Sequence, residues 1–128
     1  MGRRGSRVSA SVGGVASSDG VTLWYRVRDL SAARDWYTIT LRFDEDYADP
    51  DGAWIRLKRG ATQIALAEGE PEADGPVAHV DVGDVKAEAD RLRANGADVG
   101  VVLELHGQIR LVEVADPDGN RIEFGQEL

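Results

Sequence analysis

One stretch near the carboxyl end of the chain decides the fold: Ala115-Asp116-Pro117-Asp118-Gly119-Asn120-Arg121-Ile122-Glu123-Phe124. Its centre predicts a tight turn, because Pro117 fixes φ at the second turn position and Gly119 adopts a positive φ at little cost. After the turn the residues alternate, which puts Ile122 and Phe124 on one face of a strand and Glu123 on the other. The stretch therefore predicts a strand whose carboxylate points away from the packed face, either into solvent or into a cavity.

The composition is that of one acidic domain. A chain of 128 residues can bury a single core, and its formal net charge is −8. The first seven residues carry three arginines and no acid, so the net charge of residues 8–128 is −11. Such a body repels phosphate groups, which excludes nucleic acid and anionic membrane as expected partners. The chain has no cysteine, no apolar run that could span a bilayer and no signal-peptide pattern, so we expect a cytoplasmic protein.

Alternation and turn signals predict the elements of two successive halves. The first half has strands over 21–28, 41–46, 53–58 and 62–67, with a helix over 31–37 that begins at Ser31 as N-cap. The second half has strands over 77–82, 101–105, 109–115 and 121–124, with a helix capped by Asp84 whose apolar face is Val85, Ala89 and Leu92. Each half is therefore predicted to have the element order βαβββ.

The halves define the expected domain organisation. Residues 1–19 are rich in Gly, Ser and Arg and are expected to form a flexible arm, with an edge strand over 8–12 as the alternative. Residues 20–128 are expected to form a single domain of two modules, 20–68 and 77–128, joined by an acidic, Pro- and Gly-rich linker at 69–76.

Two motifs carry a resemblance to a known family. Val27-Arg28-Asp29-Leu30-Ser31, followed by Trp36-Tyr37 and Leu41-Arg42-Phe43, resembles the opening of the vicinal oxygen chelate superfamily, which includes glyoxalase I, bleomycin-resistance proteins and extradiol dioxygenases. Arg42 stands where that family usually has glycine. Asp116-Pro117-Asp118-Gly119-Asn120-Arg121-Ile122-Glu123 resembles its ending. The resemblance implies an α+β fold in which two βαβββ modules form a curved mixed sheet around a concave cavity.

The resemblance also implies where a metal would lie. Metal-dependent members place ligands on the first and last strands of each module, and the matching positions here are Thr22, Ala65, His79 and Glu123. Only His79 and Glu123 are metal-ligand types. Asp81 lies on the same strand face as His79 and would be a third ligand. Gln63 would be a ligand only if the strand register shifts. Two or three ligands fall short of the usual site, so we favour no metal, with His79 and Glu123 hydrogen-bonded to each other instead.

Strand parity extends the set that lines the implied cavity. If Thr22 and Glu123 face the cavity, the alternate residues of their strands face it too. The residues on one face of strand 53–58 are expected to line the cavity as well. The predicted ligand-binding residues are Thr22, Trp24, Arg26, Trp54, Arg56, Asp81 and Arg121. Indoles and guanidiniums suit a planar or aromatic ligand that carries an anionic group. A register slip of one residue would reverse this assignment.

These residues fit two classes of function. The favoured one is metal-independent binding of a small aromatic or anionic molecule, as in proteins that sequester an antibiotic or a metabolite. The alternative is an enzyme of the same superfamily, a lyase, isomerase or dioxygenase. It would use a divalent Zn, Ni, Mn or Fe ion at His79, Glu123 and Asp81, or acid–base catalysis by His79 and Glu123. Relatives often build the cavity across two chains, so the resemblance implies a homodimer, either swapped or side by side.

Overall fold

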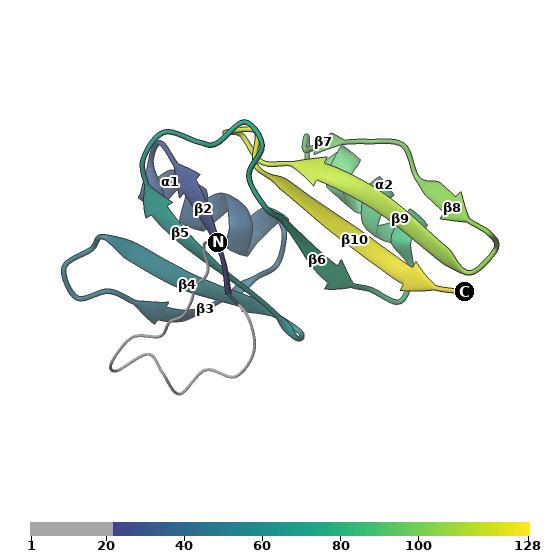
Figure 1. Ribbon diagram of the computed structural model, residues 1–128, viewed down its shortest axis with the longest axis horizontal. Coiled ribbons are helices and arrows are strands. Elements are labelled where there is room, and N and C mark those ends of the chain that lie inside the picture. Colours follow the sequence, from purple (N-terminus) through teal and green to yellow (C-terminus); the bar gives the residue numbers. More distant parts are fainter. Residues whose placement is uncertain (1–21) are drawn as a thin grey trace.

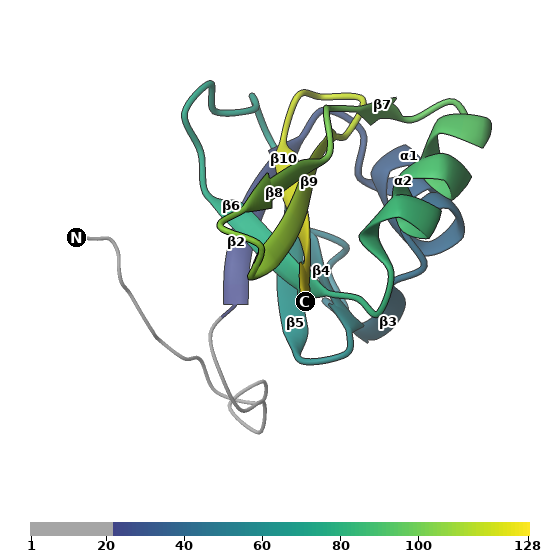
Figure 2. The ribbon, with the colours of Figure 1, turned by 90° about the vertical axis from the view of Figure 1, so that its right-hand side faces the viewer.

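The computed structural model describes residues 22–128. The sequence expectations for residues 1–19, a flexible arm or an edge strand over 8–12, lie outside this range. The described chain forms two twisted sheets that lie side by side, one from each half of the sequence (Figure 1). Both helices lie on one side of the sheets (Figure 2). The architecture is the mixed α+β arrangement that the sequence predicted.

The first sheet contains the strands of the first half. Its order is β2-β5-β4-β3, where β2 is Thr22–Val27, β5 Thr62–Glu68, β4 Trp54–Arg59 and β3 Asp44–Ala48. Strands β2 and β5 pair in parallel, and the other neighbours are antiparallel. The parallel pair requires a crossover between β2 and β5, and this crossover contains the first helical segment and the β3–β4 hairpin.

The second sheet repeats this plan. Its order is β6-β10-β9-β7, where β6 is Val77–Asp81, β10 Arg121–Glu127, β9 Ile109–Ala115 and β7 Asp98–Val99. Strand β8 (Leu103–Leu105) also pairs with β9. Strands β6 and β10 are parallel, as are β2 and β5 in the first sheet. The single strand expected over 101–105 is therefore wrong, because two short strands share the edge of β9.

The helices begin at aspartates. Asp29 caps α1 (Leu30–Asp35), since its Oδ1 accepts a hydrogen bond from the Ala32 amide at 3.0 Å, so the predicted cap at Ser31 is wrong. Asp84 caps α2 (Val85–Ala94) in the same way, as predicted. The buried residues of α2 are Val85, Ala89 and Leu92, the face expected from the sequence.

Helix α1 continues as one turn of π-helix, η2 (Trp36–Thr40). The Leu41 amide donates to the Trp36 carbonyl and the Phe43 amide to the Tyr37 carbonyl, so residues 41–43 close this wider turn. They are not available for strand pairing, which is why β3 begins at Asp44 rather than at the predicted residue 41.

The core lies between the sheets and the helices. Its largest fully buried side chains are aromatic or branched aliphatic: Tyr25, Tyr37, Phe43, Phe124, Leu41, Leu57, Ile64, Leu66, Leu92 and Ile122. Alternate strand residues belong to it, so the intervening residues of each strand point to the face opposite the helices. This face carries the candidate functional residues.

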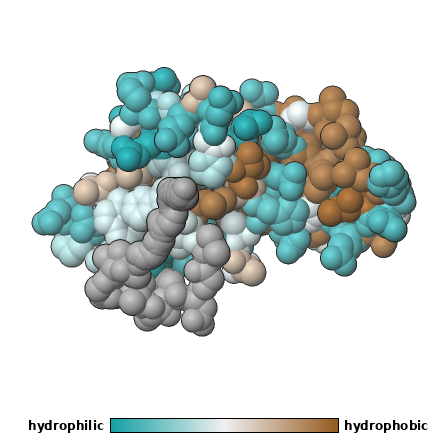
Figure 3. All heavy atoms as spheres, in the orientation of Figure 1, coloured by the Kyte–Doolittle hydropathy of each residue, from teal (hydrophilic) through white to brown (hydrophobic). Residues whose placement is uncertain are grey.

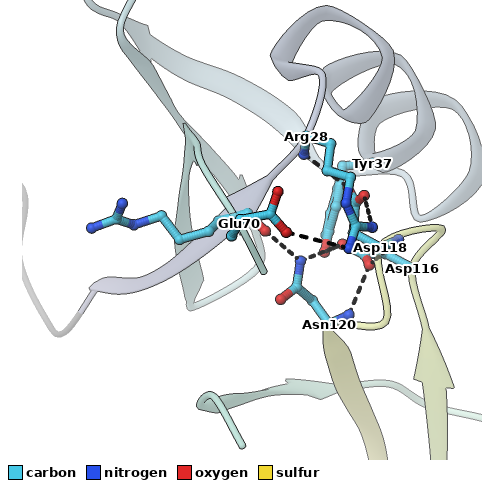
Figure 4. Close-up of polar contacts among 7 residues, drawn as sticks. Arg28, Tyr37, Glu70, Asp116, Asp118 and Asn120 are labelled. Carbon is cyan, nitrogen blue, oxygen red and sulfur yellow. Dashed lines mark hydrogen bonds and ion pairs between the residues drawn. The ribbon is translucent and has the colours of Figure 1, made fainter. Parts of the chain in front are cut away.

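The stretch that ends in β10 holds the two halves together. Asp116 is buried, and its carboxylate accepts hydrogen bonds from the Tyr37 hydroxyl at 2.7 Å and from the Asn120 and Asp118 amides at 2.8 and 2.9 Å. The Asn120 side chain donates to the same carboxylate and to the Arg26 carbonyl (Figure 4). The turn thus docks the second half onto η2 and β2 of the first.

A second contact between the halves runs through Tyr25. Its hydroxyl donates to the Arg121 carbonyl at 2.6 Å and accepts from the Ala78 amide at 2.8 Å. Burial and the nearby Asp116 raise the pKa of Tyr25 to about 12, against the opposing effect of the Ala78 hydrogen bond. The phenol therefore stays protonated and can donate and accept at once.

Candidate functional site

The first sheet presents an aromatic–arginine face, which consists of Trp24, Arg26, Tyr47, Trp54 and Arg56, on the side opposite the helices. The register aligns Trp24, Ala65, Arg56 and Tyr47 in one row across the strands, and Arg26, Ala67 and Trp54 in the next. The predicted parity of the two tryptophans and two arginines is therefore confirmed. Their ligand-binding role stays a prediction.

The two indoles meet above the central strand. Trp24 on β2 and Trp54 on β4 flank β5, yet their ring centroids lie 5.0 Å apart. They reach across because Ala65 and Ala67 of β5 fill little space beneath them. Tyr47 extends the row, with its ring centroid 5.2 Å from that of Trp54. The rings are tilted by 49° and 37° to one another, and Trp24 is 47% exposed, so an aromatic side chain of this row is open to solvent.

The two arginines of this face differ in their mobility. Arg56 is buried, donates from Nε to Asp46 at 2.8 Å and stacks over the Tyr47 ring with its Cζ 5.8 Å from the centroid. Arg26 is exposed, and its stem lies against the Gly69 backbone. The guanidinium of Arg56 is thus fixed, whereas that of Arg26 is free to move over the edge of the aromatic row.

The second sheet presents a His79 cluster, which consists of His79, Asp81, Glu123 and Gly125. His79 Nδ1 lies 2.7 Å from Glu123 Oε2, and His79 Nε2 lies 2.9 Å from Asp81 Oδ1. The predicted hydrogen bond between His79 and Glu123 is therefore confirmed. The imidazole lies over Gly125, where a Cβ atom would clash with the ring.

Two carboxylates favour the charged form of the imidazole. Partial burial lowers the pKa of His79, but the hydrogen bonds and charges of Glu123 and Asp81 outweigh burial, so the pKa rises above its usual 6.5. Both ring nitrogens then donate. A protonated imidazole is the wrong form for a general base, so this arrangement disfavours base catalysis by His79 near neutral pH.

The raised pKa makes one contribution to stability depend on pH. The folded state binds the His79 proton more tightly than the unfolded state does, so this contribution is fully present below about pH 6.5 and is lost as the pH rises through the folded-state pKa. We expect the difference in unfolding free energy between wild type and His79→Gln to be larger at pH 6 than at pH 9. Urea denaturation at both values measures it, and an equal difference would contradict the assignment.

Gly125 is required for the position of the His79 ring. We expect Gly125→Ala to displace the imidazole, to break its bonds to Glu123 and Asp81, and to cost about 1–3 kcal/mol. Urea denaturation measures the loss of stability, and NMR titration should show that the pKa of His79 falls. Gly83→Ala is the control, because its added Cβ meets nothing within 4 Å. An unchanged pKa of His79 in Gly125→Ala would show that the position of the imidazole does not depend on the absence of a Cβ atom at residue 125.

The remaining predicted residues lie at the margins of these two groups. Thr22 lies opposite Gln63, with its Oγ1 3.5 Å from the amide oxygen. Arg121 shares the face of the His79 cluster and pairs with Glu113 at 3.6 Å. Sequence reasoning missed Tyr47 and Asp46 as parts of the site. Tyr47 lay just beyond the predicted end of its strand, so its place beside Trp54 could not be read from the pattern.

Among residues 22–128, cavities lie away from the aromatic–arginine face. One, of about 360 Å³, is lined by α2, the β6–α2 loop, Arg42 and Arg59; another, of about 150 Å³, lies between α1 and the Asp116–Asp118 turn. Neither includes Trp24, Trp54 or Arg56. The indoles fill the space above Ala65 with each other, so the aromatic–arginine face is a surface rather than an enclosed pocket in the single chain.

The family model of the Glyoxalase/Bleomycin resistance protein/Dioxygenase superfamily matches residues 19–124. The chain belongs to this superfamily. The match includes both modules and the Asp116–Glu123 motif, as the resemblance implied. None of the curated proteins compared with the chain matches it.

Solved structures of superfamily members include binding proteins and an enzyme. TnmS3, an antibiotic binding protein from Streptomyces sp. CB03234, is 27% identical, with a TM-score of 0.72 over 88% of this chain and 98% of that chain. The bleomycin-binding protein from bleomycin-producing Streptomyces verticillus is 20% identical (TM-score 0.66; 84% and 95%). Lactoylglutathione lyase from Agrobacterium tumefaciens is 21% identical (TM-score 0.66; 85% and 93%). The last two likenesses establish the fold alone.

Many superfamily members hold a divalent metal, but the residues here do not fit one. Both ring nitrogens of His79 lie within hydrogen-bond distance of carboxylates, so neither is left without a partner to face a metal ion. Within residues 22–128, no group of three or more His, Cys, Asp or Glu side chains is placed to hold a metal ion.

In the same part of the chain, no helix has the length and apolarity that crossing a membrane takes.

The internal repeat shows what replaces the metal ligands in the first module. His79 lies five residues before the α2 cap, and Trp24 lies five residues before the α1 cap. Trp24 pairs with Ala65 as His79 pairs with Glu123. The resemblance placed Thr22 at the position that corresponds to His79, but in the register Trp24 lies opposite Ala65 and Thr22 lies opposite Gln63. An indole and a methyl group thus stand in this superfamily member where the second module has an imidazole and a carboxylate.

Proposed function

We propose that this protein binds a small, flat aromatic molecule with an anionic group, without a metal, and thereby sequesters an antibiotic or a metabolite in the cytoplasm. The observation that carries the proposal is the group of Trp24, Trp54 and Tyr47, with Arg56 over the Tyr47 ring and the exposed Arg26 on the same face. Stacking on the row holds an aromatic ring, and a guanidinium holds the anionic group.

The chemistry of the first module favours binding over catalysis. The aromatic–arginine face offers indole, phenol, guanidinium and methyl groups, and the Asp46 carboxylate beside it accepts from Arg56 Nε, so that it is engaged by a cation rather than free to act as a general base. In the second module both ring nitrogens of His79 lie beside carboxylates, which favour its charged form over the neutral form that a general base needs. The 27% identity to TnmS3, which is an antibiotic binding protein, supports the same class of function.

We further propose that a second copy of the chain completes the site. On the second sheet, Leu103 and Leu105 are 54% and 42% exposed and Val101 is 77% exposed. Apolar residues gather over β8 and β9 on the face opposite the helices (Figure 3). An exposed apolar strip on one module and an exposed aromatic row on the other suit a two-fold dimer in which each covers the other.

Titration of the purified protein tests the proposal. We expect 2-naphthoate and anthraquinone-2-carboxylate to quench tryptophan fluorescence saturably and to bind by calorimetry in the presence of EDTA, and we expect the apparent mass in solution to be that of a dimer. Absence of saturable binding, or binding that EDTA abolishes, would contradict metal-independent recognition. A monomer that still binds would contradict only the shared site.

A further inference from the structure

A cavity of about 360 Å³ lies away from the aromatic–arginine face and adjoins the His79 cluster at Asp81. Three arginines from three separate segments line it: Arg42 follows η2, Arg59 ends β4 and Arg91 belongs to α2. Such a gathering of guanidiniums stands out in a protein whose net charge is −8. The three cations differ in whether a carboxylate of the protein is paired with them.

Two of the arginines are fixed by the protein. Arg59 donates from both terminal nitrogens to Glu88, at 3.0 and 3.2 Å, and also to the Leu41 carbonyl at 2.9 Å. Arg91 donates to Glu88 at 2.6 Å and to the Thr40 carbonyl at 3.0 Å. Burial raises the pKa of Glu88, but its bonds to both arginines outweigh burial and lower it. One carboxylate thus serves two rigid guanidiniums.

Arg42 is the third cation, and it is free. Within residues 22–128 it has no hydrogen-bond or ion-pair partner, and its side chain lines the cavity. Its φ is 60°, a value that glycine adopts readily and other residues rarely. The Cβ atom of an arginine makes this conformation sterically unfavourable, whereas glycine adopts it without that cost, and the charge of Arg42 forms no contact with the described residues that would compensate.

The acids of the cavity do not neutralise Arg42. Glu88 is taken by Arg59 and Arg91. Asp84 accepts the Ala87 amide as the cap of α2, and Asp81 accepts from His79. In addition, the Nε atom of Arg91 is buried without a partner. The cavity therefore holds two preplaced guanidiniums beside a third that lacks a counter-ion.

We propose that this cavity binds a phosphate group, supplied by free phosphate or by a small phosphate ester, with Arg42 as its main contact. Guanidinium forks match the geometry of phosphate oxygens. Arg59 and Arg91, held in place by Glu88 and by the carbonyls at the end of η2, lower the ordering cost of binding. This site is separate from the aromatic–arginine face, so it would be a second, independent ligand site.

Calorimetric titration of the full chain with inorganic phosphate and with phenyl phosphate, at constant ionic strength, tests this. We expect saturable binding that Arg42→Gly weakens at least about tenfold, as the loss of one charge-assisted contact implies. Glycine is the suitable replacement because it adopts the φ of Arg42 without strain, so the variant stays folded. Tighter binding of phenyl phosphate would identify an ester as the ligand, and equal binding would identify the free anion.

Arg34→Ala is the matched control, since it removes one exposed positive charge away from the cavity. It should leave phosphate affinity unchanged, and Arg42→Lys should retain part of it. Absence of saturable phosphate binding, an equal loss in Arg34→Ala, or equal binding of chloride would overturn the proposal. Aromatic carboxylates that quench tryptophan fluorescence should do so equally in Arg42→Gly, so failure at one site is distinguishable from failure at the other.

Discussion

Asp116→Ala is expected to lower the unfolding free energy by about 3–4 kcal/mol, because it leaves several buried donors without an acceptor. The carboxylate accepts from the Tyr37 hydroxyl, the Asn120 side chain and two amides of its own turn. These bonds fix the turn and join the halves, so the loss should extend to both modules. Urea denaturation followed by tryptophan fluorescence and by circular dichroism measures it.

Asp118→Ala is the comparison for this variant. Its side chain belongs to the same turn but pairs with the exposed Arg28 at 3.1 Å, so its loss should cost less than about 1 kcal/mol. Tyr37→Phe should lie between the two variants, because it removes one donor and leaves the carboxylate three others. Equal effects of Asp116→Ala and Asp118→Ala would show that the turn as a whole, rather than the buried carboxylate, joins the halves.

Trp54→Ala is expected to weaken binding of an aromatic carboxylate roughly 30-fold, the loss typical of a central aromatic contact. Trp54 touches both Trp24 and Tyr47, so its removal breaks the stacking surface at its middle. Trp54→Phe should retain much of the affinity, since a smaller ring still stacks. Calorimetry with anthraquinone-2-carboxylate measures both variants.

Trp36→Phe is the matched control for Trp54. Trp36 belongs to η2 and packs against Tyr37 in the core, away from the aromatic–arginine face. It should leave affinity unchanged while it removes one tryptophan from the fluorescence signal. If Trp36→Phe weakened binding as strongly as Trp54→Ala, the ligand would have to lie elsewhere on the protein.

Most of the fold was predictable because its signals are local. Alternation located β2, β5, β6 and β9 to within one residue at each end, and Asp84 with the spacing of Val85, Ala89 and Leu92 defined α2. The misplaced boundaries have physical causes. Residues 41–43 are not part of β3 because they close a π-helical turn. Two short strands, β7 and β8, pair with the edge of β9, where a single strand was expected. Neither effect has a local sequence signal.

The site was predictable in its parity but not in its contacts. The sequence placed Trp24, Arg26, Trp54 and Arg56 on one face, and the register bears this out. It could not tell that the two indoles touch across β5, because that depends on the small volume of Ala65 and Ala67 between them. The resemblance also placed Thr22 at the position of His79, whereas the register gives that position to Trp24, since the pairing of two parallel strands is decided by packing rather than by chain length.

By itself, the Asp116–Phe124 stretch determined the turn, the alternation of β10 and the resemblance that led to the superfamily. These depend on backbone preferences and on period-two patterning, which any short segment carries. Only the tertiary structure decided what its acids do. Asp116 is a buried acceptor because Tyr37 of the other half reaches it, and Glu123 holds a proton on His79 because the bare backbone of Gly125 leaves room for the ring.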